Sequence, residues 1–501
     1  MSAFAAKHLI YPIHERLLKR KTFRYLRAME ASQWHAPTDI LELQRTKLLA
    51  LLRHARAVSP FYRARLGDES EGISSDNPTA DAPSFDPGAG RGTDRIPGPS
   101  PGQSVHRPCY TKMRHSSLGE ILESLPLLSK SEIQQSIEHM KWQDAPGGLT
   151  CQSTGGSTGN PLAFYVDRRR QGYDQAARLR SHRWFGVEVG ERELYLWGSP
   201  IEWTQTDRLK RLRDRLFNHR LLNAFAMSPA QMDQYLDQWD RFRPISLYGY
   251  PSSIALLIEH ARTRNRTLDS RLLKAVFVTG EVCFPHQRQT ISEFFGVPVA
   301  NGYGSREAGF IAHECPVGNM HICAENVIVE IIDADGRRIP NGESGEIVVT
   351  HLDAFGMPMI RYRTGDLGRL RNGRCACGRG LPMMDVVSGR TTDFIVLPDG
   401  TVKHALSIIY PLRGMSGVRQ FRVVQDQNHA VSVQVVADDR RMRITLEAVA
   451  QRIRPVIGDE VGLKVELVDH IQCPESGKHR YVVSHAPQPN SNVRAGDTAD
   501  A

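Results

Sequence analysis

A short loop rich in glycine, serine and threonine is the part of this sequence whose chemistry is easiest to state. Residues 153–161 read Ser-Thr-Gly-Gly-Ser-Thr-Gly-Asn-Pro and precede a strand-like run at 162–166. Glycines let backbone N–H groups turn toward an anion, and hydroxyls add neutral donors. The loop therefore predicts polyphosphate binding. It is not an ordinary P-loop, because Asn160 stands where a lysine is expected. Taken alone, the loop is explained equally well as a surface turn.

Four further motifs follow the loop in a fixed order. They are Asn-Gly-Tyr-Gly-Ser-Arg-Glu at 301–307, Arg-Tyr-Arg-Thr-Gly-Asp at 361–366, Ser-Gly-Arg-Thr-Thr-Asp at 388–393, and Pro-Glu-Ser-Gly-Lys at 474–478. The series resembles the adenylate-forming (acyl-activating) superfamily. It is most similar to the phenylacetate–CoA ligase branch, which includes the CapK-like proteins of capsular polysaccharide biosynthesis. The resemblance extends from about residue 41 to residue 484.

The resemblance implies activation of a carboxylic acid by Mg-ATP, in which the carboxylate attacks the α-phosphate and pyrophosphate leaves. Such a site must neutralise phosphate charge, fix the adenosine and supply a cation at the transition state. The residues that would contact ATP are Ser153, Thr154, Gly155, Gly156, Ser157, Thr158, Gly159, Tyr303, Gly304, Asp366 and Arg390.

Individual roles also follow from the resemblance. Glu307 would hold Mg²⁺ against the phosphates, since a hard cation prefers carboxylate oxygens. Asp366 would accept hydrogen bonds from the ribose hydroxyls, Tyr303 would line the adenine, and Arg390 would contact ribose or phosphate. The plainer alternatives are a helix-capping acid for Glu307 and a common turn for Thr-Gly-Asp.

The C-terminal motif supplies the expected catalytic lysine. Lys478 would bridge the carboxylate and the α-phosphate during adenylation, although a solvated turn lysine is the alternative. Asp393 occupies the position at which the family hinges between its large and small domains. The catalytic set implied by the resemblance is therefore Lys478, Glu307 and Arg390.

The pocket for the carboxylic acid is the least defined part of the prediction. In the resembling family it lies between the strand ends and the Tyr-Gly motif. The candidates are Trp197, Tyr248, Tyr250, Gly280, Glu281 and Gly302. The aromatic side chains suit an aryl or acyl group, but they would suit an ordinary hydrophobic core as well.

Cysteines provide a second chemical pattern. The chain has eight cysteines, and we expect a reducing cytoplasm, so disulfides are not expected. Cys315, His321, Cys375 and Cys377 would form a closed tetrahedral set for a structural zinc ion. His313 and Cys323 are alternative ligands. Cys151, Cys283 and Cys473 are interpreted as small hydrophobic residues, and Cys109 as incidental.

These residues need a scaffold, and the hydrophobic pattern predicts an α/β protein. Strands at 194–197, 245–248 and 275–279 alternate with helices such as 252–262, which is typical of a parallel sheet. A meander follows at 326–350. Strands at 420–424, 431–436 and 463–468 with a helix at 444–456 predict a small α+β unit. One long helix is expected over 41–67.

We therefore expect a large adenylate-forming domain with mixed sheets and helices, followed by a small mobile α+β domain. The expected division is a helical segment at 1–67, a disordered insertion at 68–107, a large ATP- and acid-binding domain at 108–392, a small lid domain at 393–485, and a disordered tail at 486–501.

Composition narrows the class of partner. The chain has 501 residues and a net charge of +9, with no apolar run near the roughly 20 residues that span a bilayer. Its first residues lack the apolar core of a signal peptide, so a cytoplasmic protein is predicted. Two basic stretches, 14–27 and 208–220, predict amphipathic helices. A solvated basic face is one interpretation of them, and binding to a membrane surface or to a polyanion is the other. No nucleic-acid-binding motif is found.

The leading hypothesis is an AMP-forming acyl- or aryl-CoA ligase that uses ATP, Mg²⁺ and CoA and carries a structural Zn²⁺. A rival hypothesis keeps the adenylation but transfers the acyl group to an amine or a sugar in surface-polysaccharide assembly. A third is a non-catalytic, membrane-associated scaffold of that pathway. The sequence identifies neither the acid nor the oligomeric state.

Overall fold

The computed structural model describes residues 2–66, 113, 115–153, 162–198, 207–224, 227–333, 335–388, 394–413, 415, 417–437, 445–469, 471 and 482–486. The predicted insertion at 68–107 lies outside these ranges, and so does the tail beyond residue 486. Within the described residues, no helix is long and apolar enough to cross a membrane.

A sheet of eleven strands forms the centre of the molecule, in the order β10-β11-β12-β13-β9-β8-β7-β6-β5-β3-β4. Its parallel half consists of β3 (Glu193–Trp197), β4 (His219–Asn223), β5 (Ser246–Gly249), β6 (Ala275–Thr279) and β7 (Val299–Ser305). The strand direction reverses between β7 and β8. Open α/β sheets commonly bind ligands outside the carboxyl ends of their parallel strands, which here are the ends of β3, β5, β6 and β7.

The antiparallel half forms the meander that the sequence predicts. It consists of β8 (Gly309–Glu314), β9 (Met320–Ile322), β10 (Val327–Ile332), β11 (Gly345–His351), β12 (Tyr362–Arg371) and β13 (Met383–Ser388). A separate two-stranded ribbon, β1 (Thr150–Ser153) and β2 (Ala163–Val166), flanks the predicted phosphate loop.

Helices cover both faces of the parallel half. α11 (Pro229–Phe242), α12 (Pro251–Thr263) and α13 (Pro285–Phe295) each begin with a proline, whose fixed φ suits the first helical turn. Val276 and Val278 of β6 belong to the apolar cluster that these helices complete. Phe277 points to the opposite face, where its ring stacks on His182 of α9 (Arg168–Arg183) at 3.8 Å between centroids.

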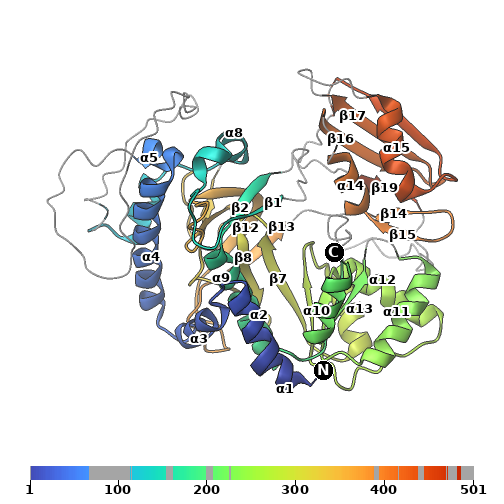
Figure 1. Cartoon of the computed structure of the whole chain (residues 1–501), viewed down its shortest axis with the longest axis horizontal. Helices are drawn as coiled ribbons and strands as arrows, with labels where there is room; N and C mark the ends of the chain where they lie inside the picture. Colours follow the sequence, from blue (N-terminus) through green and yellow to red (C-terminus); the bar gives the residue numbers. More distant parts are fainter. Residues whose placement is uncertain are drawn as a thin grey trace, which may run out of the picture.

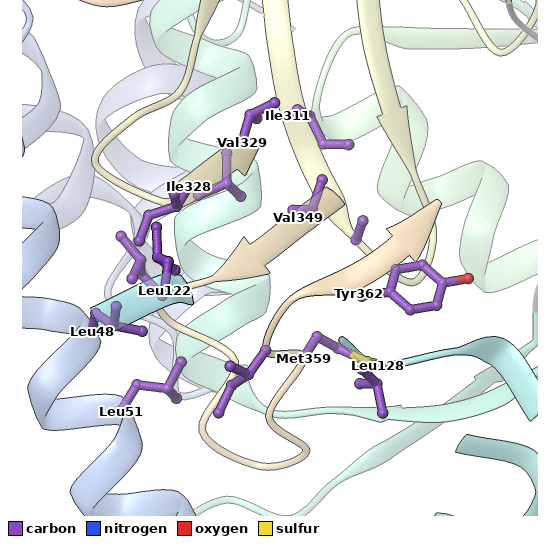
Figure 2. Close-up of a cluster of buried hydrophobic side chains, with 14 of the residues drawn as sticks. Leu48, Leu51, Leu122, Leu128, Ile311, Ile328, Val329, Val349, Met359 and Tyr362 are labelled. Atoms are coloured by element: carbon purple, nitrogen blue, oxygen red, sulfur yellow. The ribbon is translucent and has the colours of Figure 1, made fainter. Parts of the chain in front are cut away.

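The antiparallel half packs against α4 (Pro37–Val58), α5 (Pro60–Leu66), α7 (Leu118–Ser124) and α8 (Lys130–Met140). Leu48, Leu51 and Leu122 meet Ile328 and Val349 of the sheet in this core (Figure 2). The prediction of one helix over 41–67 was wrong in two respects. The helix begins at Pro37 and is interrupted at Ser59, before a second helix starts at Pro60. Leu41 is exposed, and the buried face runs through Ile40 and Leu48 instead.

The N-terminus forms a helical hairpin. α1 (Ala3–Ala5), the π-helical turn η1 (Ala6–Ile10) and α2 (Tyr11–Leu17) are continuous, and α3 (Thr22–Ser32) packs along α9. α10 (Asp207–Leu216) lies beside this hairpin (Figure 1). The helix predicted at 208–220 therefore ends early, because residues from His219 onward join β3 as strand β4.

A smaller α+β unit follows residue 394 and stands apart at the upper right of Figure 1. Its four-stranded sheet has the order β18-β17-β16-β19, with β16 (Val418–Gln425), β17 (Val431–Ala437), β18 (Leu463–Leu467) and β19 (Val482–Ser484). α14 (Leu406–Arg413) and α15 (Leu446–Ile457) complete its core, and β14 (Phe394–Val396) pairs with β15 (Val402–His404). The predicted strands and helix of this unit are confirmed to within a few residues, and the α/β fold class is confirmed.

Candidate active site

The site residues that the sequence predicts gather where the sheet reverses direction. Tyr303 and Gly304 lie on β7, and Glu307 follows in the turn before β8. Asp366 lies on β12, which is far from β7 in the strand order. The carboxyl ends of parallel strands face one edge of the sheet, so these side chains and the β3, β5 and β6 termini can address one ligand.

Tyr303 and Asp366 are in direct contact. The Tyr303 hydroxyl donates a hydrogen bond to Asp366 Oδ2 at 2.9 Å. The backbone N–H of Asp366 in turn donates to Thr364 Oγ1 at 3.1 Å, and the Thr364 hydroxyl donates to the Ile347 carbonyl at 2.8 Å. The carboxylate is thus held in place from β7 and from its own strand, and a carboxylate has several lone pairs for further donors.

Glu307 is buried, with 4% of its surface exposed. The Tyr362 hydroxyl donates to its Oε1 at 3.3 Å, and the turn beside it is closed by the Ala308 N–H donating to Ser305 Oγ. A buried carboxylate needs partners or a cation. Glu307 is therefore not the exposed helix-capping acid that the plainer interpretation of its motif requires.

Two arginines connect Glu307 to the predicted phosphate loop. Arg170 of α9 is buried and donates to the Arg306 carbonyl at 2.7 Å. The Arg306 guanidinium donates to the Ser153 carbonyl, at the end of β1, at 3.3 Å. The chain therefore enters the loop at 154–161 beside the turn that carries Glu307. Ser153 is described, whereas Thr154, Gly155, Gly156, Ser157, Thr158, Gly159 and Asn160 lie outside the described residues.

Arg170 and Tyr362 are site residues that the sequence interpretation missed. Tyr362 falls inside a quoted motif, four positions before Asp366, so its position on the same strand was the available signal. Arg170 lies on α9, where polar and apolar residues do not separate into two faces, so the sequence gives no sign that this arginine is buried. It also lies over the Phe164 ring at 5.6 Å, which fixes its side chain against β2.

Three of the predicted pocket residues form one aromatic wall. Trp197 at the end of β3 stacks on Tyr250 after β5, with ring centroids 4.1 Å apart. Gly280 lies against both rings, since a Cβ there would be 2.9 Å from Tyr250 and 3.1 Å from Trp197. Gly302 lies on β7, the strand beside β6, and its carbonyl accepts a hydrogen bond from Thr279 Oγ1 at 2.7 Å.

The other two predicted pocket residues have structural partners. Tyr248 points toward His182 and Phe277 under the opposite face of the sheet, and burial raises the pKa of its phenol to about 12. Glu281 accepts two hydrogen bonds from Ser252 at the start of α12, one from the backbone N–H at 2.8 Å and one from the serine hydroxyl. A carboxylate at a helix N-terminus stabilises that helix. Arg390, Asp393 and Lys478 lie outside the described residues.

The four predicted zinc ligands meet in space. The ligand atoms of Cys315, His321, Cys375 and Cys377 all lie within 4.8 Å of one another. The Cys315 and Cys375 Sγ atoms are 3.7 Å apart, and Cys377 Sγ is 3.3 Å from His321 Nε2. In a tetrahedral site with Zn–S bonds of about 2.3 Å, sulfur atoms are about 3.8 Å apart. Their donor types and spacing therefore fit zinc.

The surroundings of this cluster also suit a metal centre. His321 Nδ1 lies 3.0 Å from the Leu381 carbonyl, and this contact orients Nε2 toward the sulfurs, as a carbonyl bonded to the other ring nitrogen does for metal-bound histidines. Burial works against the Cys375 thiolate, but N–H donors from Cys377 and Asn319 hold the pKa of this thiol below its usual range. His321 pairs with Met383, so the cluster joins the β8–β9 hairpin to the β12–β13 loop.

The remaining cysteines and histidine stand apart from the cluster. Cys323 and His313, the alternative ligands, are buried but do not belong to the group of ligand atoms, although His313 is the cross-strand partner of His321. Cys283 is partly buried, in line with its interpretation as a small hydrophobic residue. The same interpretation was wrong for Cys151, which is exposed because the two-stranded ribbon leaves one face of β1 uncovered. Cys109 and Cys473 lie outside the described residues.

Comparison with known proteins agrees with this architecture. The family model for AMP-binding enzymes matches residues 221–354, and that for the CapK C-terminal domain matches residues 395–485. Phenylacetate–CoA ligase of Thermus thermophilus is 29% identical over 273 residues, which are 48% of this chain and 60% of the relative. Protein CapK of Staphylococcus aureus is 22% identical over 73% of this chain and 80% of its own length.

Solved structures show the same fold. 2-Hydroxyisobutyryl-CoA ligase in complex with 2-HIB-AMP and CoA, in the thioesterification state, aligns with a TM-score of 0.58 at 20% identity over 91% of both chains. The same ligase in the postadenylation state gives a TM-score of 0.54 at 21% identity, over 90% of this chain and 91% of the other. The matched family models and the fold agree: this chain carries an AMP-binding enzyme domain and a CapK C-terminal domain, and it is similar to phenylacetate–CoA ligases and to CapK, which supports the adenylate-forming superfamily.

Proposed function

We propose that this protein is an AMP-forming ligase that activates a carboxylic acid with Mg-ATP and transfers the acyl group to CoA. The observation that carries the proposal is the contact between Tyr303 and Asp366, beside the buried Glu307. Two motifs that the resemblance assigns to adenosine binding come from distant parts of the chain and meet at one point. Surface turns with no common ligand would have no reason to converge in this way.

In this proposal, the described residues bind and position ATP. Asp366 accepts hydrogen bonds from the ribose hydroxyls and is held by Tyr303, whose ring lines the adenine. Glu307 holds Mg²⁺, which supplies charge neutralisation at the phosphates. Arg170 positions the turn that carries Glu307. The resemblance adds backbone donors from 154–159, Arg390 at the nucleotide, Lys478 at the reacting oxygens and Asp393 at a hinge.

The acid would enter along the wall formed by Trp197 and Tyr250. Gly280 packs directly against the two rings, so any side chain at this position would displace the wall. Glu281 supports this wall through its hydrogen bond at the start of α12, and the Tyr248 ring contacts it with its centroid 5.6 Å from that of Trp197. The acid itself is an aryl, fatty or hydroxy acid in this proposal.

A second acceptor class has a specific observation in its favour. The C-terminal unit, residues 395–485, matches the CapK C-terminal domain model. An enzyme with the same adenylation step could transfer the acyl group to an amine or a sugar instead of CoA. A non-catalytic scaffold is less well supported, because Glu307 is buried and Asp366 is held by the Tyr303 hydroxyl, an organised setting that a scaffold would not need.

We also propose that Cys315, His321, Cys375 and Cys377 hold a structural zinc ion. All four ligands come from the protein, which is the closed arrangement of structural sites. The ion would fix the β12–β13 loop to β9 and so support the strand that carries Asp366. The cysteines of the described residues are free, which suits the reducing cytoplasm in which we place the protein.

The test is pyrophosphate release from ATP and Mg²⁺ with a panel of aryl, fatty and hydroxy acids, with and without CoA. Lys478→Ala is the inactive comparison. Lys464→Ala is the matched control, since Lys464 is an exposed lysine in the same C-terminal unit. Acid-dependent release that Lys478→Ala loses and Lys464→Ala keeps would support adenylation.

The acceptor is read from the same assay. A rise in turnover with CoA, together with a thioester product, supports transfer to CoA. Acid-dependent release that CoA leaves unchanged supports an amine or sugar acceptor. Absence of release across the whole panel, with no binding of ATP by calorimetry, would contradict the proposal.

A further inference from the structure

The N-terminal helix exposes a row of large apolar side chains. Phe4, Leu9, Ile13 and Leu17 have 74%, 58%, 49% and 75% of their surfaces exposed. They lie on the continuous helix formed by α1, η1 and α2, which Figure 1 shows at the lower edge of the molecule. A soluble protein has many single exposed apolar residues, but four on one side of one helix form a surface that fits an interaction.

The π-helical turn is what aligns these side chains. The row steps by five residues from Phe4 to Leu9 across η1, and then by four to Ile13 and Leu17. In a regular α-helix a step of five rotates a side chain about 140° from its starting direction, whereas a π turn closes i→i+5. The extra residue thus keeps Phe4 in line with the other three.

The opposite side of the helix is fixed to the body by the same step. Ala6, Tyr11 and Glu15 are buried, and they too are separated by five and then four residues. A Cβ on Gly190, whose φ is +87°, would lie 2.8 Å from the Ala3 carbonyl and from the Lys7 backbone nitrogen. Lys7 also pairs with Glu188 at 2.8 Å. The helix is therefore held with its apolar row facing outward.

The exposed charged side chains of residues 2–29 are basic, and Glu188, which pairs with Lys7, is an acid beside them. Arg16, Lys19, Lys21, Arg24 and Arg27 are all exposed. The only acid among residues 2–29 is Glu15, which is buried and bonded to Arg20 and Thr22. A basic rim around an apolar row is the pattern of a helix that lies in the interface of an anionic membrane.

The second basic stretch of the sequence reaches the same place. Phe217, which directly follows α10, has its ring centroid 4.4 Å from that of Tyr11 and 4.9 Å from that of His14. α10 therefore ends against the N-terminal helix, and its Arg213 and Arg215 are exposed. The two basic segments, separated by almost two hundred residues, are thus neighbours in the fold, with α10 packed on the side of the N-terminal helix that carries the buried Tyr11.

We propose that this surface, defined by Phe4, Leu9, Ile13 and Leu17 with its basic rim, binds the face of an anionic lipid bilayer. The helix lies in the membrane plane, with the apolar side chains among the acyl chain ends and the arginines and lysines at the headgroup phosphates. A second copy of this chain would place two such basic rims against each other, and their charges would oppose the contact. The proposal does not depend on the ligase activity.

Vesicle flotation with the full-length protein tests it. The vesicles are phosphatidylcholine alone or phosphatidylcholine with 30% phosphatidylglycerol. One variant removes the apolar row (Phe4→Ser, Leu9→Ser and Leu17→Ser), and one removes rim charge (Lys19→Gln, Lys21→Gln and Arg24→Gln). The matched control is Leu272→Ser, Val317→Ser and Leu467→Ser, which changes three apolar side chains exposed elsewhere. Thermal unfolding checks that each variant is folded.

We expect the wild type and the control to float with the anionic vesicles and to be released by 0.5 M salt. The charge variant should lose about 100-fold in partition coefficient, because each basic residue near an anionic surface contributes about fivefold. The apolar variant should lose more than about tenfold. Failure of the wild type to float would overturn the proposal, as would equal flotation of the apolar variant. A concentration-dependent dimer in sedimentation that the apolar variant abolishes, without vesicle binding, would overturn it in favour of self-association.

Discussion

The Tyr303 hydroxyl lies 2.9 Å from Asp366 Oδ2, although the two residues are 63 positions apart and belong to strands that are not neighbours in the sheet. This contact brings together the parallel half of the sheet, through β7, and the antiparallel half, through β12. A ligand that needs both residues can bind only if the two halves keep this arrangement. The contact therefore links the fold to the proposed nucleotide site.

Replacing Asp366 should weaken ATP binding most. Hydrogen bonds to a charged acceptor contribute about 1.5–3 kcal/mol each, so Asp366→Ala should raise the KM for ATP about 10- to 100-fold. Tyr303→Phe should have a smaller effect, since it removes one bond that orients the carboxylate. Steady-state kinetics with varied ATP measures both. Asp385→Ala is the control, because Asp385 forms a surface ion pair with Arg369 on the neighbouring strand. An unchanged KM in Asp366→Ala would contradict the ribose-binding role.

Replacing Glu307 should act through the cation. Glu307→Gln keeps the size of the side chain and its contact with Tyr362 but removes the charge that holds Mg²⁺. We expect kcat to fall about 100-fold and the Mg²⁺ concentration for half-maximal rate to rise. A Mg²⁺ titration at saturating ATP measures this. Glu314→Gln, at the far end of β8 and paired with Arg288, is the matched control. If both variants show the same Mg²⁺ dependence as wild type, Glu307 does not bind the ion.

Much of this arrangement could be predicted from the sequence because short patterns determine it. The strand at 275–279 is confirmed to the residue, since a run of Val and Phe between breakers fits a buried parallel strand. Cys315, His321, Cys375 and Cys377 were predicted as one set, and their side chains do gather. Here residue types with strict chemical requirements limited the choice.

Other features could not be predicted, because they depend on contacts between distant segments. Arg361 is buried and forms a double ion pair with Glu330, which no local pattern reveals. Arg170 donates to the Arg306 carbonyl, although most of the parallel half of the sheet lies between these two residues in the sequence. The boundary between α10 and β4 was missed because a basic, leucine-spaced segment fits a helix until the neighbouring β3 offers a pairing edge.

Removal of a zinc ligand should lower both metal content and stability. We expect the wild type to contain about one equivalent of zinc, and Cys375→Ser to contain less than half of that, with a loss of at least about 2 kcal/mol in the free energy of unfolding. Cys323→Ser is the matched control, since Cys323 is a buried cysteine outside the cluster. Elemental analysis and chemical unfolding measure the two quantities. Wild-type protein without zinc, and Cys375→Ser as stable as Cys323→Ser, would contradict the site.

Mild acid should destabilise the protein through His219. Burial lowers the pKa of its imidazole to about 4 from an ordinary value of 6.5, although Glu193, whose Oε2 lies 3.7 Å from His219 Nε2, opposes the shift. Between these two values the unfolded chain binds a proton that the folded protein does not. Stability is therefore full above about pH 6.5 and falls as the pH decreases toward 4, by about 1.4 kcal/mol per pH unit for one such group.

The variant His219→Gln isolates this contribution. Glutamine does not titrate, so the free energy of unfolding should depend less steeply on pH between 6.5 and 4.5 than in the wild type, even if its value at pH 7.5 is lower. Urea unfolding at pH 7.5, 6.5, 5.5 and 4.5 measures the slope. Glu193 titrates outside this pH range. Burial raises the pKa of its carboxyl, but Arg178, His182 and His219 together lower that pKa to about 2, so its contribution to stability is lost only below about pH 4.5. Equal slopes in wild type and His219→Gln above pH 4.5 would show that the pKa of His219 is the same in the folded and unfolded protein and that its burial does not control acid stability.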